Sequence, residues 1–140
     1  MPNQLYTCLW FDGNAKDAAD YYCRIFENGK ILMENSTVII LEINKTKLMA
    51  LNGGAQYQLS PAASLVIECD TQTEIDYYWE QLGKGGIYSR CGWLTDRFGV
   101  SWQIIPSVLP QLMADPEKAP KVAQVFVHMT KFEIAPLLEV

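Results

Sequence analysis

Residues 14–31 read NAKDAADYYCRIFENGKI, and residues 70–87 read DTQTEIDYYWEQLGKGGI. Both stretches carry an Asp-Tyr-Tyr triplet, which begins at Asp20 in the first and at Asp76 in the second, an offset of 56 residues. The same offset relates three further pairs: Phe26 and Leu82, Gly29 and Gly85, and Ile31 and Ile87. A repeat of fixed period is typical of a duplicated supersecondary unit. The alternative is a chance likeness between two amphipathic helices that end in Gly.

Each stretch is predicted to form a helix with one buried face. Asn14 with Asp17, and Thr71 with Glu74, have the spacing of a capping box at a helix start. The apolar residues that follow recur at intervals of three and four. They are Ala15, Ala18, Ala19, Tyr22, Ile25 and Phe26 in the first copy, and Ile75, Tyr78, Trp79 and Leu82 in the second. Asn28-Gly29 is expected to supply a left-handed C-cap to the first helix.

Strand patterns surround both helices. A short apolar run precedes each helix, at residues 8–11 and 65–67. After the first helix we expect strands at residues 31–33, 37–43 and 47–52, and after the second at 87–94 and 100–105, with a possible split at Gly92. Neither half is long enough to enclose a core alone. The predicted fold is therefore α+β, with tandem βαβββ modules (1–56 and 57–106) whose sheets curl around a common cavity.

Residues 107–140 form a different kind of segment. Asp115-Pro116 has the pattern of an N-cap followed by proline at the first helical position, although Pro120 would favour a later start. Residues 134–138 suggest a last short turn that Pro136 interrupts. We expect a helical tail that lies against the sheet or against a partner subunit.

Composition excludes several classes of function. The 140-residue chain has 49% hydrophobic and 19% charged residues, as soluble globular proteins do. Its net charge is -5 and no basic cluster occurs along it, so nucleic acid is not an expected partner. The apolar stretches are of strand length, whereas a membrane span needs about 20 apolar residues. Residues 1–5 lack the pattern of a signal peptide, which makes the cytoplasm the expected location.

Side chains that usually carry chemistry are sparse. His128 is the single histidine, so no Ser-His-Asp or Cys-His group is expected. The four cysteines include no C-x-x-C pair and are interpreted as small apolar fillers. The glycine clusters match neither a dinucleotide fingerprint nor a P-loop, and carboxylate pairs such as Asp17 and Asp20 lie at helix starts. Trp10, Trp79, Trp93 and Trp102 are expected mostly in the core, with some rings available to line a pocket.

Four segments together carry a family likeness. They read CLWFDGN at residues 8–14, LMALNGG at 48–54, YYW at 77–79 and CGWLTDRFGVSWQ at 91–103. In this combination the chain resembles the PhnB-like branch of the vicinal oxygen chelate superfamily, which includes glyoxalase I, bleomycin-resistance proteins and extradiol dioxygenases. The resemblance implies a single PhnB-like domain over residues 1–140, with paired βαβββ modules and the tail at 107–140. Members of this branch are often labelled 3-demethylubiquinone-9 3-methyltransferase, and relatives commonly pair, which implies a homodimer.

The resemblance also says where a metal would be held. Metal-dependent members use His and Glu from the first, fourth, fifth and eighth strands. In this chain the two His positions are Thr7 and Ala63, the eighth-strand Glu position is Gln103, and residues 47–52 contain neither His nor a carboxylate. Hydroxyl and amide groups are poor ligands for a transition metal. No metal and no cofactor is therefore expected.

What remains is a cavity between the predicted sheets. Strand alternation puts its candidate residues on one face of each strand. The candidate ligand-binding residues are Thr7, Leu9, Phe11, Ala63, Leu65, Ser101, Gln103 and Ile105. The leading interpretation is a metal-free protein that binds a small organic molecule. Two alternatives are an enzyme of the same fold with unidentified acid-base groups, and a structural dimer whose cavity is filled by its own aromatic side chains.

Overall fold

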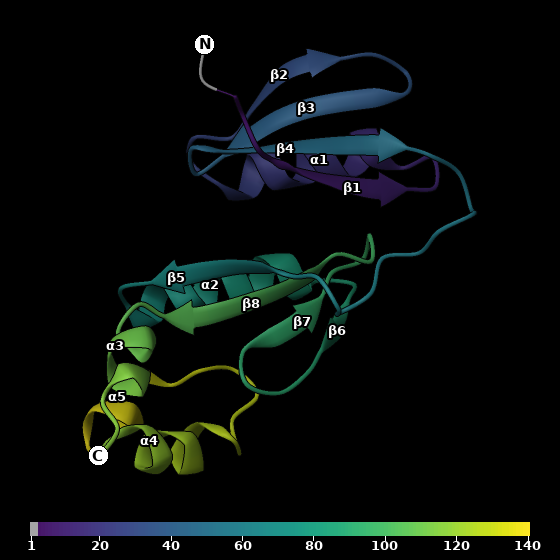
Figure 1. Cartoon of the computed structure of the whole chain (residues 1–140). Coiled ribbons are helices and arrows are strands. Elements are labelled where there is room, and N and C mark those ends of the chain that lie inside the picture. The colour runs from purple at the N-terminus through teal and green to yellow at the C-terminus, as the bar shows by residue number, and fades with distance from the viewer. Residues whose placement is uncertain (1–2) are drawn as a thin grey trace. The chain divides into compact units, whose positions relative to one another are not determined.

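The computed structural model describes residues 3–140 (Figure 1). The chain divides after Leu59 into two compact units, and each is described by itself. The first unit contains β1 (Thr7–Phe11), α1 (Ala15–Ile25), β2 (Lys30–Glu34), β3 (Val38–Ile43) and β4 (Thr46–Asn52). The second contains β5 (Leu65–Cys69), α2 (Gln72–Gly83), β6 (Ile87–Tyr88), β7 (Trp93–Thr95), β8 (Ser101–Pro106) and the tail helices α3 (Leu109–Ala114), α4 (Ala119–Phe126) and α5 (Ile134–Leu138).

The two units have the same sheet topology. The strand order is β1-β4-β3-β2 in the first sheet and β5-β8-β7-β6 in the second. The first strand of each unit runs parallel to the last, and the other neighbours are antiparallel. This confirms the predicted α+β fold of two βαβββ modules followed by a helical tail. Residues 87–94, which the sequence leaves as one strand or two, form β6 and β7.

The two helix starts are capped differently. At α2 the Thr71 hydroxyl accepts a hydrogen bond from the Glu74 backbone N–H at 3.2 Å, as predicted. At α1 Asn14 is the N-cap residue but its side chain makes no cap hydrogen bond. The free N–H of Ala15 donates instead to Oδ1 of Asn52 in β4, at 2.9 Å. The cap of α1 thus comes from a strand, which a local sequence pattern does not reveal.

The predicted C-cap at Gly29 is wrong. Helix α1 ends at Phe26 in extended backbone, and Gly29 is not among the residues with positive φ. Gly29 is needed for a different reason, because a Cβ there would collide with the backbone of Cys23. The turn between β3 and β4 does have left-handed backbone, with φ of 48° at Asn44 and 63° at Lys45, as a two-residue hairpin requires.

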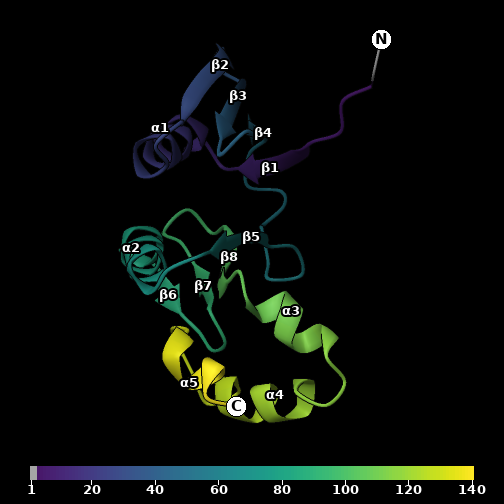
Figure 2. The ribbon, with the colours of Figure 1, turned by 90° about the vertical axis from the view of Figure 1, so that its left-hand side faces the viewer.

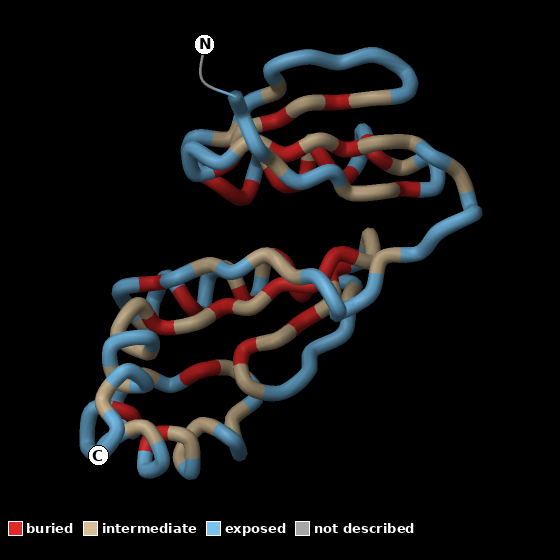
Figure 3. The backbone as a smooth tube through the Cα atoms, viewed as in Figure 1, coloured by how far each residue is buried: buried red, intermediate tan, exposed pale blue. Residues whose placement is uncertain are grey.

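Each sheet has one face covered by the helix of its own unit, and most of the buried strand residues lie on this face. Figure 3 colours the buried residues red along the chain. In the first sheet this helix-covered face includes Asn52, which contacts α1, and the residues in register with it. Its buried side chains are Phe11, Ile39, Leu41, Ile43, Leu48 and Ala50. In the second sheet the buried side chains of the helix-covered face are Cys69, Leu94, Trp102 and Ile104. We call the opposite surface of each sheet its open face.

The tail extends the covered side of the second sheet. Phe132 is buried, and a Cβ added to Gly92 would meet its ring. Figure 2 shows α5 returning toward α2, where the Gln72 side chain accepts from Ile134 N–H and donates to the Phe132 carbonyl, both at 2.8 Å. Lys131 pairs with Asp76 of the same helix at 2.7 Å. The tail is therefore fixed to α2 by three polar contacts, and the buried Phe132 ring lies next to Gly92.

The start of α4 differs from the expected one. Asp115 does not cap this helix: its carboxylate accepts from Glu117 N–H at 2.9 Å in the preceding turn. The helix begins at Ala119 and Pro120 lies in its first turn, where a missing N–H is tolerated. Among the helices described for residues 3–140, none is long and apolar enough to cross a membrane.

Candidate functional site

The register of the first sheet decides where three predicted site residues lie. Thr7, Leu9 and Phe11 pair with Leu48, Ala50 and Asn52 of β4 and so share the helix-covered face. Phe11 is buried there, Leu9 is half-buried and Thr7 is exposed at the strand's start. Alternation along β1 groups these residues correctly, but it does not say which side the helix covers. These three residues were expected to line a cavity, but the register puts them on the face that α1 covers.

The second sheet divides its candidate residues between both faces. Ser101, Gln103 and Ile105 lie on the open face, because β8 alternates with Trp102 and Ile104 on the covered face. Leu65 is in register with Trp102 and lies on the covered face. Ala63 is exposed in the turn before β5. The structure therefore brings together Ser101, Gln103 and Ile105 of the candidate set.

Gln103 forms a hydrogen bond with Ser64, the residue just before β5. Its Nε2 donates to the Ser64 hydroxyl at 3.0 Å. Ser101 is 2% exposed, and its hydroxyl has no hydrogen-bond partner among residues 3–140. Buried hydroxyls are normally satisfied, so the open face carries one unmet polar group.

A pocket of about 470 Å³ lies on the second unit, at the β6–β7 end of this sheet. Its lining residues are Pro61, Ile87, Ser89, Arg90, Trp93, Leu94 and Thr95. Trp93 and Thr95 are in register with Gln103 and Ser101, so these two lining side chains belong to the open face, whereas Leu94 belongs to the covered face. Sequence reasoning missed it except for Trp93. The signal available was the turn around Gly92, which places Ser89 and Arg90 beside Trp93.

The four tryptophans have separate roles. Trp79 and Trp102 are in the core, and the Trp102 indole N–H donates to Asp96 at 2.9 Å. The Trp10 indole N–H donates to the Gly54 carbonyl at 2.8 Å, and the Trp10 ring makes an edge-to-face contact with the ring of Tyr57. Trp93 lines the pocket. Two of the four rings are therefore in the core, where most were expected, and one lines a pocket.

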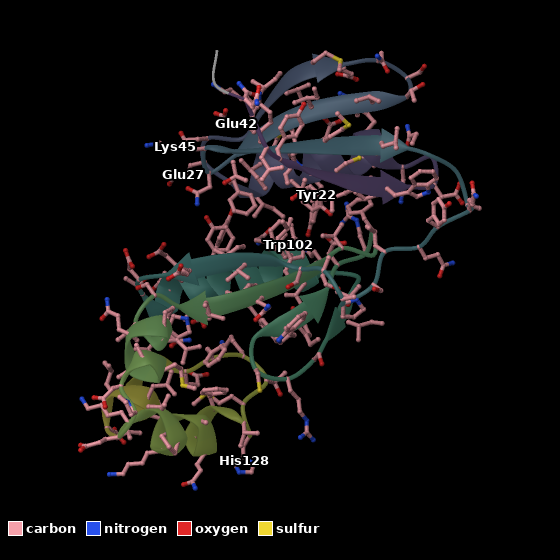
Figure 4. The ribbon with its side chains drawn as sticks, viewed as in Figure 1. Tyr22, Glu27, Glu42, Lys45, Trp102 and His128 are labelled. Atoms are coloured by element: carbon pink, nitrogen blue, oxygen red, sulfur yellow. The ribbon has the colours of Figure 1, made fainter. Side chains whose placement is uncertain are left out.

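The first unit has a polar pocket of about 570 Å³ at the β3–β4 hairpin. It is lined by Gln4, Leu5, Tyr6, Thr7, Glu42, Lys45, Thr46 and Lys47. Its charged groups are largely engaged: Glu42 pairs with Lys30, and Lys47 donates to Gln4 and lies over the Tyr6 ring. Figure 4 labels Glu42 and Lys45 at this end of the unit.

The residues present do not fit a transition metal. Gln103 and Ser64 are neutral and hydrogen-bonded to each other. Burial raises the pKa of the Cys69 thiol to about 12, with Glu74 and Asp70 adding to the shift, so this thiol stays protonated and is a poor ligand. Within residues 3–140, no group of three or more His, Cys, Asp and Glu side chains could hold an ion. His128 is exposed, two residues beyond α4 (Figure 4).

Comparison with solved structures identifies the fold. The chain is similar to a PhnB protein from Bacillus cereus, with 25% identity, a TM-score of 0.67, and coverage of 74% of this chain and 99% of that one. A protein from Pseudomonas aeruginosa matches with 20% identity, a TM-score of 0.64, and coverage of 75% and 98%. A glyoxalase-related enzyme from Fulvimarina pelagi matches with 16% identity, a TM-score of 0.53, and coverage of 76% and 91%. These neighbours share the vicinal oxygen chelate fold.

No curated protein matches the chain. A family model, by contrast, matches residues 3–105, which spans both βαβββ modules and ends within β8. Its description is 3-demethylubiquinone-9 3-methyltransferase. The family match, the paired modules and the likeness to the PhnB protein agree with one another. The chain belongs to the PhnB-like family described as 3-demethylubiquinone-9 3-methyltransferase, within the vicinal oxygen chelate superfamily.

Proposed function

We propose that this protein binds a small organic molecule, without a metal ion, in the pocket lined by Arg90, Trp93 and Thr95. The observation that supports the proposal most is the composition of that pocket. Its volume of about 470 Å³ is within the usual range for small-molecule sites. Apolar surface from Pro61 and Ile87 stands beside a few polar groups, which is the usual pattern of a ligand site.

The proposal keeps part of the site expected from the sequence. Ser101, Gln103 and Ile105 continue the open face from Thr95 along β8, so a ligand in the pocket has this strip beside it. Thr7, Leu9, Phe11 and Leu65 do not belong to the proposed site, since they lie on helix-covered faces. The proposed location is the cytoplasm. The four free cysteines support it, because oxidising compartments favour disulfides.

The family description raises methyl transfer as a second candidate function. The usual biological methyl donor carries its methyl group on a positively charged sulfonium. Arg90 is the one charged side chain that lines the pocket described for the second unit, and it is also positive. Two like charges in one small site repel each other. The residues of this pocket therefore do not fit that cofactor, and they favour binding over group transfer.

An occluding substitution tests the proposal. The Thr95→Trp side chain fills the pocket from the open face and does not enter the helix-covered core. Thr73→Trp, on the exposed surface of α2, is the matched control. Saturation-transfer NMR with benzoate, benzamide and 2-naphthoate should give signals with the wild type and with Thr73→Trp, and none with Thr95→Trp. Signals of equal strength in all three proteins would show that these molecules do not use the pocket.

A further inference from the structure

We infer that the ligand of this pocket is an aromatic monocarboxylate, whose charge pairs with Arg90 and whose ring packs on Trp93. This inference rests on the proposed function and deepens it, because it commits the site to one chemical class. Three observations support it: the charge of Arg90, the ring of Trp93, and the backbone of the turn that joins these two residues.

The charge of the pocket is the first argument. Arg90 is exposed and forms no ion pair with any residue in the described part of the chain, 3–140. The whole chain has a net charge of -5, yet the one charged side chain that lines the pocket of the second unit is positive. A guanidinium presents a planar fork of N–H donors that matches a carboxylate with two parallel hydrogen bonds. An anionic group is the natural partner for this side chain.

The number of positive side chains in the pocket favours one class of anion over another. One arginine and no lysine lines the pocket, and the other polar lining side chains are the hydroxyls of Ser89 and Thr95. A single positive charge balances a carboxylate, whereas a phosphate monoester carries nearly two negative charges at neutral pH. Binding the phosphate would leave an uncompensated charge beside Trp93 and Ile87. The pocket therefore favours the monoanion.

The ring argument rests on Trp93. Its indole N–H makes no hydrogen bond within residues 3–140, unlike those of Trp10 and Trp102. Ile87, in the strand next to it, is 71% exposed. An aromatic ligand would cover this apolar surface, and aromatic rings attract each other in offset or edge-to-face arrangements. The pocket thus offers a flat apolar part next to a cation.

The backbone fixes Arg90 relative to Trp93. The Trp93 N–H donates to the Arg90 carbonyl at 3.1 Å, and the residues between them have φ of 57° at Cys91 and 79° at Gly92. Positive φ at both central positions is typical of a type I′ turn, and for Cys91 it is costly. The N–H groups of Cys91 and Gly92 each donate at 2.8 Å to the tail, to the carbonyls of Met129 and Thr130.

These contacts hold the turn in one conformation. A strained residue persists only where its surroundings enforce it, and such residues cluster at ligand sites. Because the turn is already ordered, less conformational entropy is lost when a ligand binds between Arg90 and Trp93.

The test is a titration of the full chain with three matched probes, followed by tryptophan fluorescence and calorimetry. The probes are 2-naphthoate, its neutral isostere 2-naphthamide, and 2-naphthyl phosphate. The wild type should bind 2-naphthoate about tenfold more tightly than the amide, because one charge-assisted hydrogen bond contributes about that factor. It should bind the phosphate more weakly than the carboxylate, and added salt should reduce only the preference for anions.

Variants assign the preference to Arg90. Arg90→Gln should bind naphthoate and naphthamide equally, and Arg90→Lys should keep part of the preference. Arg24→Gln, which removes an exposed arginine from α1, should behave as the wild type. Equal affinity of the wild type for naphthoate and naphthamide, or a preference that survives Arg90→Gln, would overturn the inference, as would tighter binding of the phosphate.

The outcomes separate this inference from the proposed function. If the probes bind without regard to charge and Thr95→Trp abolishes their binding, the pocket is real and the assigned class is wrong. If no probe binds, or if Thr95→Trp changes nothing, both proposals fail together.

Discussion

The carboxylate of Asp96 accepts the indole N–H of Trp102 at 2.9 Å, and both residues are buried. The other oxygen of Asp96 accepts the backbone N–H groups of Phe98 and Val100, at 2.9 and 3.0 Å. One side chain thus closes the turn between β7 and β8 and fixes the largest ring of the second core. A buried carboxylate is tolerated here because several donors surround it.

Asp96→Asn should destabilise the protein by about 1–3 kcal/mol. The amide oxygen can replace one acceptor, but the amide NH₂ then faces the indole N–H of Trp102, which leaves two donors without an acceptor. Urea denaturation, followed by tryptophan fluorescence, measures the free energy of unfolding. Asp12→Asn, at an exposed position, is the control and should change it little. Equal stability of the two variants would contradict this account of Asp96.

Gln103→Leu should leave the fold intact and cost at most about 1 kcal/mol, since its hydrogen bond with Ser64 is partly exposed to solvent. If the open face carries the ligand, this variant should weaken the binding of polar probes more than that of apolar ones. Comparing the 2-naphthamide and naphthalene affinities of wild type and variant measures the difference. Ser64→Ala removes the other partner of this hydrogen bond. An equal loss of affinity in that variant would assign the effect to the hydrogen bond.

The ion pair of Asp76 and Lys131 should make stability depend on pH in acid. The hydrogen bond from Lys131, with that from Gln72, holds the pKa of Asp76 below its usual range. A carboxyl with a depressed pKa stabilises the folded state above its unfolded pKa, near pH 4, and loses this contribution as the pH falls through the folded value. Wild type should therefore exceed Asp76→Asn in stability at pH 7, and the two should converge as the pH falls below the depressed pKa of Asp76.

The expected difference at pH 7 is less than about 1 kcal/mol, because both side chains are partly exposed and solvent screens the pair. Thermal unfolding at a series of pH values checks it. A difference that grew in acid would have the wrong sign for this mechanism.

Purified protein should contain no stoichiometric transition metal. Ser64 and Gln103 are neutral, the buried Cys69 thiol is protonated, and within residues 3–140 no group of three or more His, Cys, Asp and Glu side chains could hold an ion. Elemental analysis after a chelator wash is the measurement. About one zinc, nickel or iron per chain would contradict the proposal of metal-free binding.

The protein should be a homodimer in solution. The tail exposes several large apolar side chains, namely Met113, Val127, Leu138 and Val140. Exposed apolar surface of this kind is typically covered by a partner, most often a second copy of the same chain. Light scattering at micromolar concentration should give twice the 15.8 kDa of one chain. A particle of 15.8 kDa would refute the expectation.

The repeat predicted the fold because each copy has the local sequence pattern of a helix flanked by strands. Thr71 and Glu74 cap α2 as the local spacing indicates, and the apolar positions of both helices are largely buried. Contacts between distant residues were beyond such reasoning. The cap of α1 comes from Asn52, and the need for glycine at position 29 comes from Cys23.

The site was harder to predict than the fold. A period of two identifies which residues of β1 share a face, but only the helix decides whether that face is covered, and at Thr7, Leu9 and Phe11 it is. The same rule groups Ser101, Gln103 and Ile105 on one face of β8, and the structure shows that this face is the open one. Arg90 lies in a turn, where no periodicity applies, and its position depends on hydrogen bonds to residues some forty positions later.

Those hydrogen bonds, from Cys91 and Gly92 to Met129 and Thr130, join a turn inside the family-matched region to a tail outside it. The matched region ends at residue 105, and the two carbonyls that hold the turn lie beyond it. Substitutions in the tail can then shift Arg90 without altering any sheet residue. In the proposed site, a tail substitution in this chain would therefore change the ligand preference while both sheets stay as they are.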